Sequence, residues 1–223
     1  MPVSTMIVAD TPENAYLEAE QFLSALDADW ERHIAHVGPC RHAAKPARDP
    51  YQALVRAIAY QQLHARAGDA ILGRMLALYA GTPFPSARQL LDTPVDVLRG
   101  CGFSAGKIAT IHGIAQAALD GVVPLRADAA AMSDAALIER LTSLRGVGRW
   151  TVEMFLIYTL ERMDILPADD FGVREGYRRL KNLPQAPTRK QIGDIGLAWS
   201  PYRTVAAWYL WRFPKNPAAD DSA

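Results

Sequence analysis

Apolar residues recur at helical spacing along almost the whole chain. After Pro12, whose ring suits the first turn of a helix, they fall at Leu17, Phe22, Leu26, Trp30 and Ile34. Strict alternation of apolar and polar residues over β-branched runs, which marks a half-buried strand, does not occur along the sequence. The pattern therefore predicts an all-α fold.

Caps and chain breakers divide this pattern into successive helices. Ser104 and Ser133 are typical N-caps, and the stretches 38–50 and 81–86 have the composition of loops. The helix that begins at Trp150 is apolar on nearly all sides, which predicts that it is buried. We expect helices over residues 12–34 (as one or two helices), 51–63, 65–80, 87–91, 95–99, 104–120, 133–143, 150–163, 173–183, 189–197 and 202–213, and a flexible tail over 214–223.

Composition limits the class of protein. With 223 residues, of which 50% are hydrophobic and 22% charged, the chain has the balance of a globular protein of one or two domains. Its two cysteines, Cys40 and Cys101, are too few for a four-cysteine metal or iron–sulfur site. They permit one disulfide, but no secretory signal is visible, and no apolar run reaches the roughly 18 residues of a membrane span. We expect a soluble, cytoplasmic protein without membrane association.

The net charge of zero conceals an uneven distribution. Residues 1–31 hold seven acidic residues and no Lys or Arg, whereas residues 140–190 hold ten basic residues against six acidic ones. Such runs usually mark solvated faces, and a basic surface that meets a polyanion is the more specific interpretation. Because the chain as a whole is neutral, binding to DNA would need specific backbone contacts as well.

A glycine motif lies between two of the predicted helices, in the segment Leu144-Arg145-Gly146-Val147-Gly148-Arg149-Trp150-Thr151. Glycine takes positive φ freely, so the Gly-x-Gly pattern permits a tight hairpin. The hairpin also exposes backbone N–H groups at the start of the next helix, where the helix dipole favours an anion such as a DNA phosphate. A plain tight turn between packed helices explains the same residues equally well.

Two adjacent carboxylates, Asp169 and Asp170, precede the next predicted helix. One structural interpretation is an N-cap, a role that Asp fills well but that needs only one of the pair. The other interpretation places a carboxylate at a helix N-terminus facing a pocket, where it acts as a base or stabilises a cation.

A third feature is the end of the predicted helix 51–63, where Gln61 and Gln62 precede Leu63. An ordinary C-terminal turn accounts for these residues. Two amides beside an apolar tip are also suited to fill a gap in a base stack and to hydrogen-bond base edges.

Taken together, these three motifs resemble those of the helix-hairpin-helix DNA glycosylase superfamily, and within it the alkylated-base branch, the 3-methyladenine DNA glycosylase II (AlkA) type. That branch shows the pattern Pro-Gly-Ile-Gly-Arg-Trp-Thr and then Leu-Pro-Asp-Asp twenty residues after the tryptophan. Trp150 and Asp170 are twenty residues apart, and Leu166, Pro167 and Asp169 fall in matching places. The resemblance covers roughly residues 50–213.

The resemblance implies a two-lobed helical body with the active-site cleft between the lobes. We expect residues 1–50 to form a helical segment that packs with the C-terminal lobe, and residues 51–165 to form the central lobe with the hairpin. Residues 166–213 would complete the other lobe and carry the catalytic aspartate. Members of the branch often begin with a sizeable mixed domain, so this chain resembles a short form.

The resemblance also implies roles for individual residues. Asp170 matches the catalytic aspartate, and Asp169 is its structural neighbour. We expect a substrate pocket of Trp150, Met154, Trp211 and Tyr60, with Tyr202 as a further candidate, where Met154 replaces a tyrosine that the family often has. For each tryptophan, plain core packing is the alternative. The expected DNA-binding residues are Gln61, Gln62, Leu63, Arg145, Gly146, Val147, Gly148, Arg149 and Thr151.

Within that set, Gln61 and Gln62 match the residues that enter the gap left by a flipped nucleotide, and Gln62 stands where the best-known member has a leucine. Main-chain carbonyls of Thr142, Leu144 and Val147 match a site for a monovalent cation, Na⁺ or K⁺. No other cofactor is expected.

Two absences refine the expected activity. Bifunctional members with lyase activity carry a lysine immediately after Gly-x-Gly-Arg, where this chain has Trp150, so no Schiff base forms at that place. The four-cysteine cluster of the endonuclease III branch is also missing.

The resemblance thus implies a monomeric, monofunctional enzyme that removes alkylated bases of the 3-methyladenine and 7-methylguanine type from double-stranded DNA. A glycosylase for deaminated or etheno bases, and a non-catalytic helix-hairpin-helix DNA-binding module, remain as alternatives.

Overall fold

The computed structural model describes residues 12–45 and 48–213. In these ranges all regular elements are helices, so the predicted all-α fold class is confirmed. None of the described helices is long and apolar enough to cross a membrane. Cys40 and Cys101 are both free thiols. The tail expected over 214–223 lies outside the described residues.

The chain divides into two compact units, each of which is described here by itself. Unit 1 combines residues 1–42 with 163–223, and unit 2 is residues 43–162, so unit 1 is discontinuous in sequence. We expected the divisions at residues 50 and 165.

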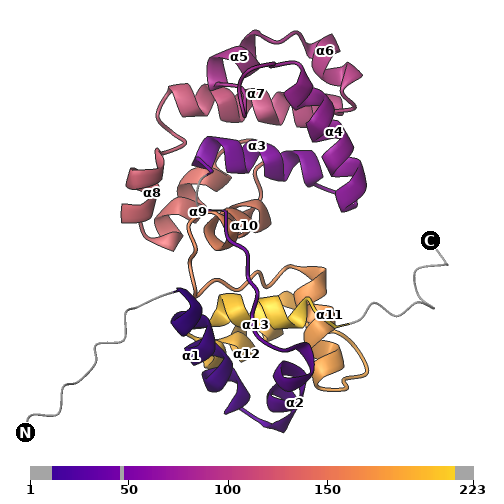
Figure 1. Ribbon diagram of the computed structural model, residues 1–223, viewed down its shortest axis with the longest axis vertical. Helices are drawn as coiled ribbons and strands as arrows, with labels where there is room; N and C mark the ends of the chain where they lie inside the picture. Colours follow the sequence, from indigo (N-terminus) through magenta and orange to yellow (C-terminus); the bar gives the residue numbers. More distant parts are fainter. Residues whose placement is uncertain (1–11, 46–47, 214–223) are drawn as a thin grey trace, which may run out of the picture. The chain divides into compact units, whose positions relative to one another are not determined.

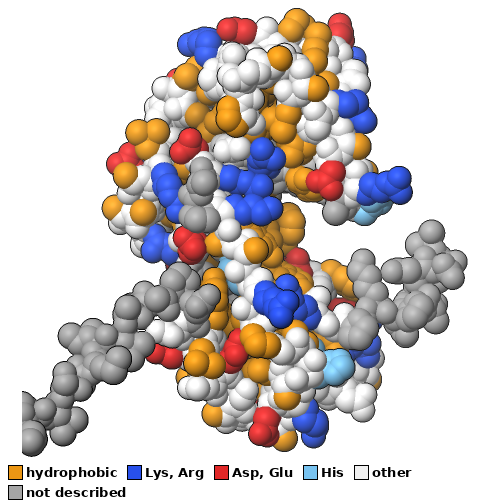
Figure 2. Space-filling model, viewed as in Figure 1, with side chains coloured by type: hydrophobic (Ala, Val, Ile, Leu, Met, Phe, Trp, Pro, Cys, Tyr) orange, Lys and Arg blue, Asp and Glu red, His pale blue; other side chains and the backbone are white. Residues whose placement is uncertain are grey.

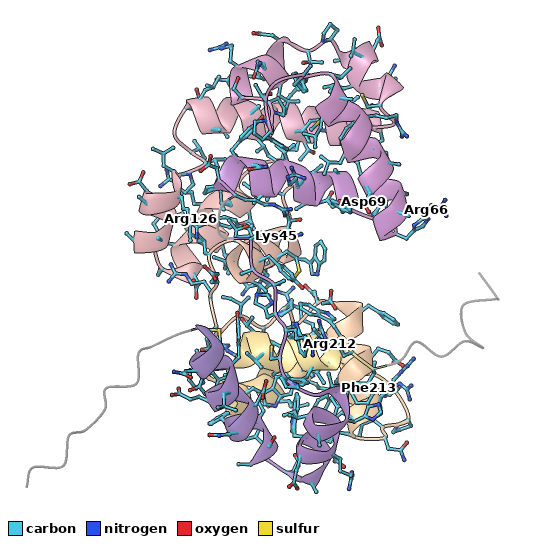
Figure 3. All side chains as sticks on the ribbon, viewed as in Figure 1. Lys45, Arg66, Asp69, Arg126, Arg212 and Phe213 are labelled. Atoms are coloured by element: carbon cyan, nitrogen blue, oxygen red, sulfur yellow. The ribbon has the colours of Figure 1, made fainter. Side chains whose placement is uncertain are left out.

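Unit 1 is built around α13, an almost fully buried helix against which α1, α2 and α11 pack (Figure 1). Its core joins Trp30 of α2, Val173 of α11 and Trp208 of α13. At the end of the described chain, Phe213 stacks on His33 of α2 with ring centroids 3.9 Å apart (Figure 3). The helices of this unit are α1 (Pro12–Ser24), α2 (Ala28–Val37), α11 (Phe171–Leu180), α12 (Arg189–Ile195), the 3₁₀-helix η1 (Gly196–Trp199) and α13 (Arg203–Leu210).

Unit 2 is organised around α3, which packs against α7 on one side and α10 on the other (Figure 1). Leu54, Val55 and Ile58 of α3 are fully buried, as their common helical stripe predicts. Its helices are α3 (Pro50–Tyr60), α4 (Ala65–Ala77), α5 (Ala87–Asp92), α6 (Val95–Gly100), α7 (Ala105–Leu119), α8 (Arg126–Ala131), α9 (Asp134–Thr142) and α10 (Arg149–Tyr158).

The helix boundaries follow local capping chemistry. Ser104 and Ser133 cap α7 and α9 by accepting from the backbone N–H groups three residues on, as predicted. Thr188 and Gln191 form a capping box at the start of α12. The expected helix 150–163 ends earlier, at Tyr158, because the chain turns at Glu161, where φ is +57°.

Candidate active site

Asp170 is the N-cap of α11 and is also bound to a tryptophan. Its Oδ1 accepts a hydrogen bond from the backbone N–H of Val173 at 3.0 Å and another from the indole Nε1 of Trp211 at 2.8 Å. The carboxylate is half-buried at the N-terminus of the helix, where the helix dipole stabilises negative charge. Asp170 is therefore the member of the acid pair that caps a helix, and its carboxylate is fixed beside an aromatic ring.

Asp169 has different surroundings. It is exposed, and its Oδ2 lies 2.9 Å from a guanidinium nitrogen of Arg189, the first residue of α12. Half of its side-chain surface is accessible, so this ion pair is a solvated surface contact. The structure thus separates two adjacent carboxylates into a surface residue and a positioned one.

Gly172 permits the close approach of Trp211 to the first turn of α11. A Cβ atom added at this glycine would lie 2.8 Å from Trp211 Cδ1 and 3.1 Å from Asp170 Oδ1. Because any side chain at residue 172 would displace the indole, the glycine is part of the geometry that holds Asp170.

The hairpin between α9 and α10 depends on Gly146 more than on Gly148. Gly146 has φ of +83°, and an added Cβ would overlap the side chain of Thr110 on α7. Gly148 is the N-cap of α10 with φ of −85°, and an added Cβ would meet nothing within 4 Å. The hairpin thus needs glycine for its backbone angles at residue 146 and not at residue 148, since any L-residue adopts the φ of Gly148.

The hairpin presents backbone donors at the start of α10. The first N–H groups of a helix have no acceptor within the helix, and in α10 these include the N–H groups of Gly148, the N-cap, and of Arg149, the first helical residue. The N–H of Val147, in contrast, donates to the carbonyl of Leu144 at 3.0 Å and closes the turn. The donors suited to an anion are therefore those at the helix start rather than that of Val147.

The loop after α3 and the hairpin border the same groove. Gln61 donates from Nε2 to Thr151 Oγ1 at 3.1 Å and to the Gly146 carbonyl at 3.4 Å. Gln62, at φ of +56°, and Leu63 are exposed. The groove has a volume of about 610 Å³ and is lined by Gln61, Gln62, residues 142–148 and Trp150.

The structure gives the surroundings of three further residues that the sequence placed at the DNA or in the pocket, and two of them, Thr151 and Tyr60, are engaged within the protein. Thr151 is only 1% exposed, so its side chain supports Gln61 and does not reach the surface. The ring of Tyr60 lies against Gly68 of α4, and its hydroxyl donates to Asp69 (Figure 3), a hydrogen bond that raises the pKa of Tyr60. Met154 is half-buried on α10, one turn after Trp150, which is 38% exposed.

Many of the basic residues in the run 140–190 are bound within the protein. Arg149 pairs with the buried Glu153 at 2.8 Å, Arg178 with Glu175, and Lys181 with Asp27 and Asp29. On the face shown in Figure 2, Lys and Arg side chains form separate groups rather than one continuous field. These ion pairs neutralise several charges of the run within the protein, so backbone donors are the more specific anion site.

Sequence patterns did not reveal the helix α7 as part of the site. Lys107 donates from Nζ to the carbonyls of Ala59 and Gln61, and Thr110 backs Gly146. These partners lie more than 30 residues away in sequence, so no local motif predicts these contacts. A lysine and a threonine three residues apart, on a helix that is mostly apolar, are the signal that the sequence offers.

The fold and the site define a class: an all-helical protein whose glycine hairpin joins two helices and whose capping aspartate follows shortly after. A family model bears out this class. The chain belongs to the HhH-GPD superfamily of base excision DNA repair proteins, whose model matches residues 55–201.

Relatives and solved structures support this membership over nearly the whole chain. The chain is 43% identical to DNA-3-methyladenine glycosylase 1 of Schizosaccharomyces pombe over 89% of its own length and 87% of that protein. It is 37% identical to the alkylbase DNA glycosidase-like protein mag2 of the same organism, over 91% of this chain and 96% of mag2.

A solved structure of the S. pombe 3-methyladenine DNA glycosylase Mag1 in complex with abasic DNA superposes with a TM-score of 0.82 at 42% identity, covering 89% of this chain and all of that chain. The DNA-3-methyladenine glycosidase of Bacillus halodurans superposes with a TM-score of 0.75 at 32% identity, covering 91% and 89% of the two chains.

Proposed function

We propose that the protein is a monofunctional DNA glycosylase that hydrolyses the N-glycosidic bond of alkylated bases in double-stranded DNA and leaves an abasic site. Its relatives named 3-methyladenine glycosylases, and the one solved with abasic DNA, support the substrate class. The observation that carries the proposal is Asp170, a carboxylate fixed by the Trp211 indole and by the first turn of α11.

The carboxylate of Asp170 acts on the sugar. The bond between C1′ and the base nitrogen breaks with its electron pair going to the base, and the sugar becomes an oxocarbenium-like cation. The negative charge of Asp170 stabilises that cation and orients a water molecule, whose oxygen bonds to C1′ while its proton leaves to solvent. Two hydrogen bonds to one oxygen hold the carboxylate in place before the charge develops, so no reorganisation is needed during the reaction.

An alkylated base explains why a single carboxylate is sufficient. Adenine methylated at N3 and guanine methylated at N7 carry a positive charge, and they leave as neutral bases without a protein acid. Aromatic rings attract such cations. Trp211 supplies a ring beside Asp170 in unit 1, and Trp150 and Met154 supply an aromatic and a polarisable side chain on one face of α10 in unit 2.

The proposed DNA-binding contacts lie in unit 2. The N–H groups at the start of α10 bind a phosphate, and the exposed Gln62 and Leu63 enter the gap that a flipped nucleotide leaves. These contacts do not depend on base sequence, which suits an enzyme that scans DNA for damage. Because one chain carries both the carboxylate and the proposed phosphate site, we propose that the protein acts as a monomer. A cytoplasmic location is likewise a proposal.

The proposal includes a monovalent cation at the hairpin. Thr142, Leu144 and Val147 all border the groove, and carbonyl oxygens are suitable donors for Na⁺ or K⁺. The Leu144 carbonyl accepts the Val147 N–H and keeps a second lone pair for the ion. When bound, the ion adds positive charge close to the phosphate site.

A single-turnover assay with a panel of lesions tests the proposed function. The parent protein should release 7-methylguanine and 3-methyladenine as free bases from methylated duplex DNA, and the strand should break only after alkali. Reduction with borohydride should trap no covalent adduct, because Trp150 occupies the position of the lyase lysine.

The alternatives give different results in the same assay. Release of ethenoadenine or hypoxanthine without methylated bases would replace the substrate class. Binding without release of any base would indicate a DNA-binding module, and a strong borohydride-trapped band would contradict the monofunctional mechanism.

A further inference from the structure

Lys107 on α7 reaches the end of another helix. Its ammonium donates to the carbonyl of Ala59 at 3.0 Å and to that of Gln61 at 2.8 Å. The last carbonyls of a helix have no partner within it, and a cation at this end is favourable for the helix dipole. Lys107 thus binds both sides of the point where α3 ends and the loop begins.

The backbone next to this contact has an unusual conformation. Gln62 directly follows Gln61 and has φ of +56°, a region that residues with a side chain rarely adopt. Holding a glutamine in this conformation is unfavourable for the backbone and needs support from surrounding contacts. The lysine bridge across residues 59 and 61 supplies contacts that favour this conformation, with the side chain of Gln62 exposed.

The same face of α7 also supports the hairpin. Thr110, one turn after Lys107, is buried and fills the space that a side chain at Gly146 would need. Gln61 completes the connection from the loop, because its amide donates to the Gly146 carbonyl and to Thr151 of α10. The loop and the hairpin are therefore fixed against one helix and against each other.

We propose that Lys107 is a positioning residue that sets the backbone of Gln62 so that this side chain enters the gap in damaged DNA. The inference rests on one part of the proposed function, namely that Gln62 contacts DNA at the gap left by a displaced nucleotide. It predicts a contribution to lesion-selective binding, whereas the phosphate contact of the hairpin contributes to all DNA binding.

The test measures equilibrium binding by fluorescence anisotropy with two duplexes of the same sequence. One contains a central tetrahydrofuran abasic analogue, and the other is undamaged. Lys107→Met should weaken binding to the abasic duplex by about tenfold, because hydrogen bonds to a charged donor are lost. Binding to the undamaged duplex should change by less than about twofold, since no gap is present there.

Three further variants separate positioning from general effects. Lys107→Arg keeps a cationic donor and should retain most of the preference for the abasic duplex. Arg88→Met removes a positive charge from an exposed position on α5 of the same unit and should leave the preference unchanged. In a Gln62→Ala background, Lys107→Met should have no additional effect, because the residue through which it acts is already absent.

Equal weakening of both duplexes by Lys107→Met, or an undiminished preference for the abasic duplex, would overturn the proposal and leave Lys107 as a simple helix cap. The readout is binding alone. A parent protein that prefers abasic DNA but releases no methylated base would therefore contradict the proposed function without affecting the test of Lys107.

Discussion

At the scale of single residues, Asp169 and Asp170 are neighbours in the chain with different partners. Asp170→Asn should lower the single-turnover rate of base release by about a hundredfold or more, because the amide lacks the charge that opposes the sugar cation. DNA binding should stay within about twofold of the parent, as no phosphate contact changes. Asparagine is also a good N-cap, so α11 should remain folded.

Asp169→Asn is the matched control. It removes only an exposed ion pair with Arg189, a type of contact worth about 0–1 kcal/mol, so base release should stay within about threefold of the parent. A normal rate for Asp170→Asn together with a large loss for Asp169→Asn would reverse the assignment within the pair.

The sequence indicated that one of Asp169 and Asp170 caps the next helix, but it did not show which of them does so, and it did not reveal the bond to Trp211. An aspartate before a helical pattern is a local signal, because the capping carboxylate and the backbone N–H that donates to it lie three residues apart. Trp211 lies 41 residues further along the chain, and its contact depends on how α11 and α13 pack. Its assignment as a pocket residue came from the resemblance to a family and stays a prediction.

At the scale of elements, the two hairpin glycines should respond differently to alanine. Gly148→Ala should keep the fold, because φ is ordinary and the space is open. The added methyl group lies at the start of α10, where it hinders a phosphate. We expect binding to damaged and undamaged duplexes to weaken by similar factors, about tenfold, as a contact to a charged group is lost.

Gly146→Ala provides the contrast. It combines a φ of +83° with a clash against Thr110, so unit 2 should lose about 2 kcal/mol or more of stability. Urea unfolding followed by circular dichroism measures this loss. If Gly148→Ala is folded and binds DNA as tightly as the parent, the hairpin is only a turn and the proposed phosphate site fails.

The helices themselves were largely predictable, and the exceptions have physical causes. The pattern located α7 and α9 through their serine caps and α3 through its apolar stripe. It missed α8, which has six residues. Its buried residue is Ala129, and one small side chain gives no periodic signal. It also extended α10 through Met163, because an apolar run does not show where the backbone turns.

At the scale of the whole molecule, ion pairs within unit 1 make its stability depend on pH. Hydrogen bonds from Arg178 lower the pKa of Glu175 from 4.5 to about 2. Burial opposes this shift, and hydrogen bonds from Arg179 add to it. The folded protein therefore keeps Glu175 ionised at a pH where the unfolded chain takes up a proton. This contribution to stability is complete above about pH 4.5 and is lost as the pH falls towards 2.

Urea unfolding of the parent and of Glu175→Gln at pH 6 and pH 3 checks this expectation. The parent should lose about 1 kcal/mol more than the variant on acidification, a value reduced for solvent screening of a partly exposed group. Glu31→Gln, at an exposed position on α2 of the same unit, is the control and should follow the parent. Identical losses in the parent and in Glu175→Gln would show that these ion pairs do not couple folding to protons.

The hydrogen bond between Trp211 and Asp170 has a spectroscopic consequence. The chain has five tryptophans, and the indole proton of this one is shared with the carboxylate to which we assign the chemistry. In a nitrogen-15 correlation spectrum its resonance would move with the charge of Asp170, and its exchange with solvent would slow as the bond tightens. The chemical shift of the nitrogen-15-labelled Trp211 indole therefore reports on the Asp170 carboxylate during a pH titration or on addition of DNA. This measurement needs neither an attached dye nor a substitution.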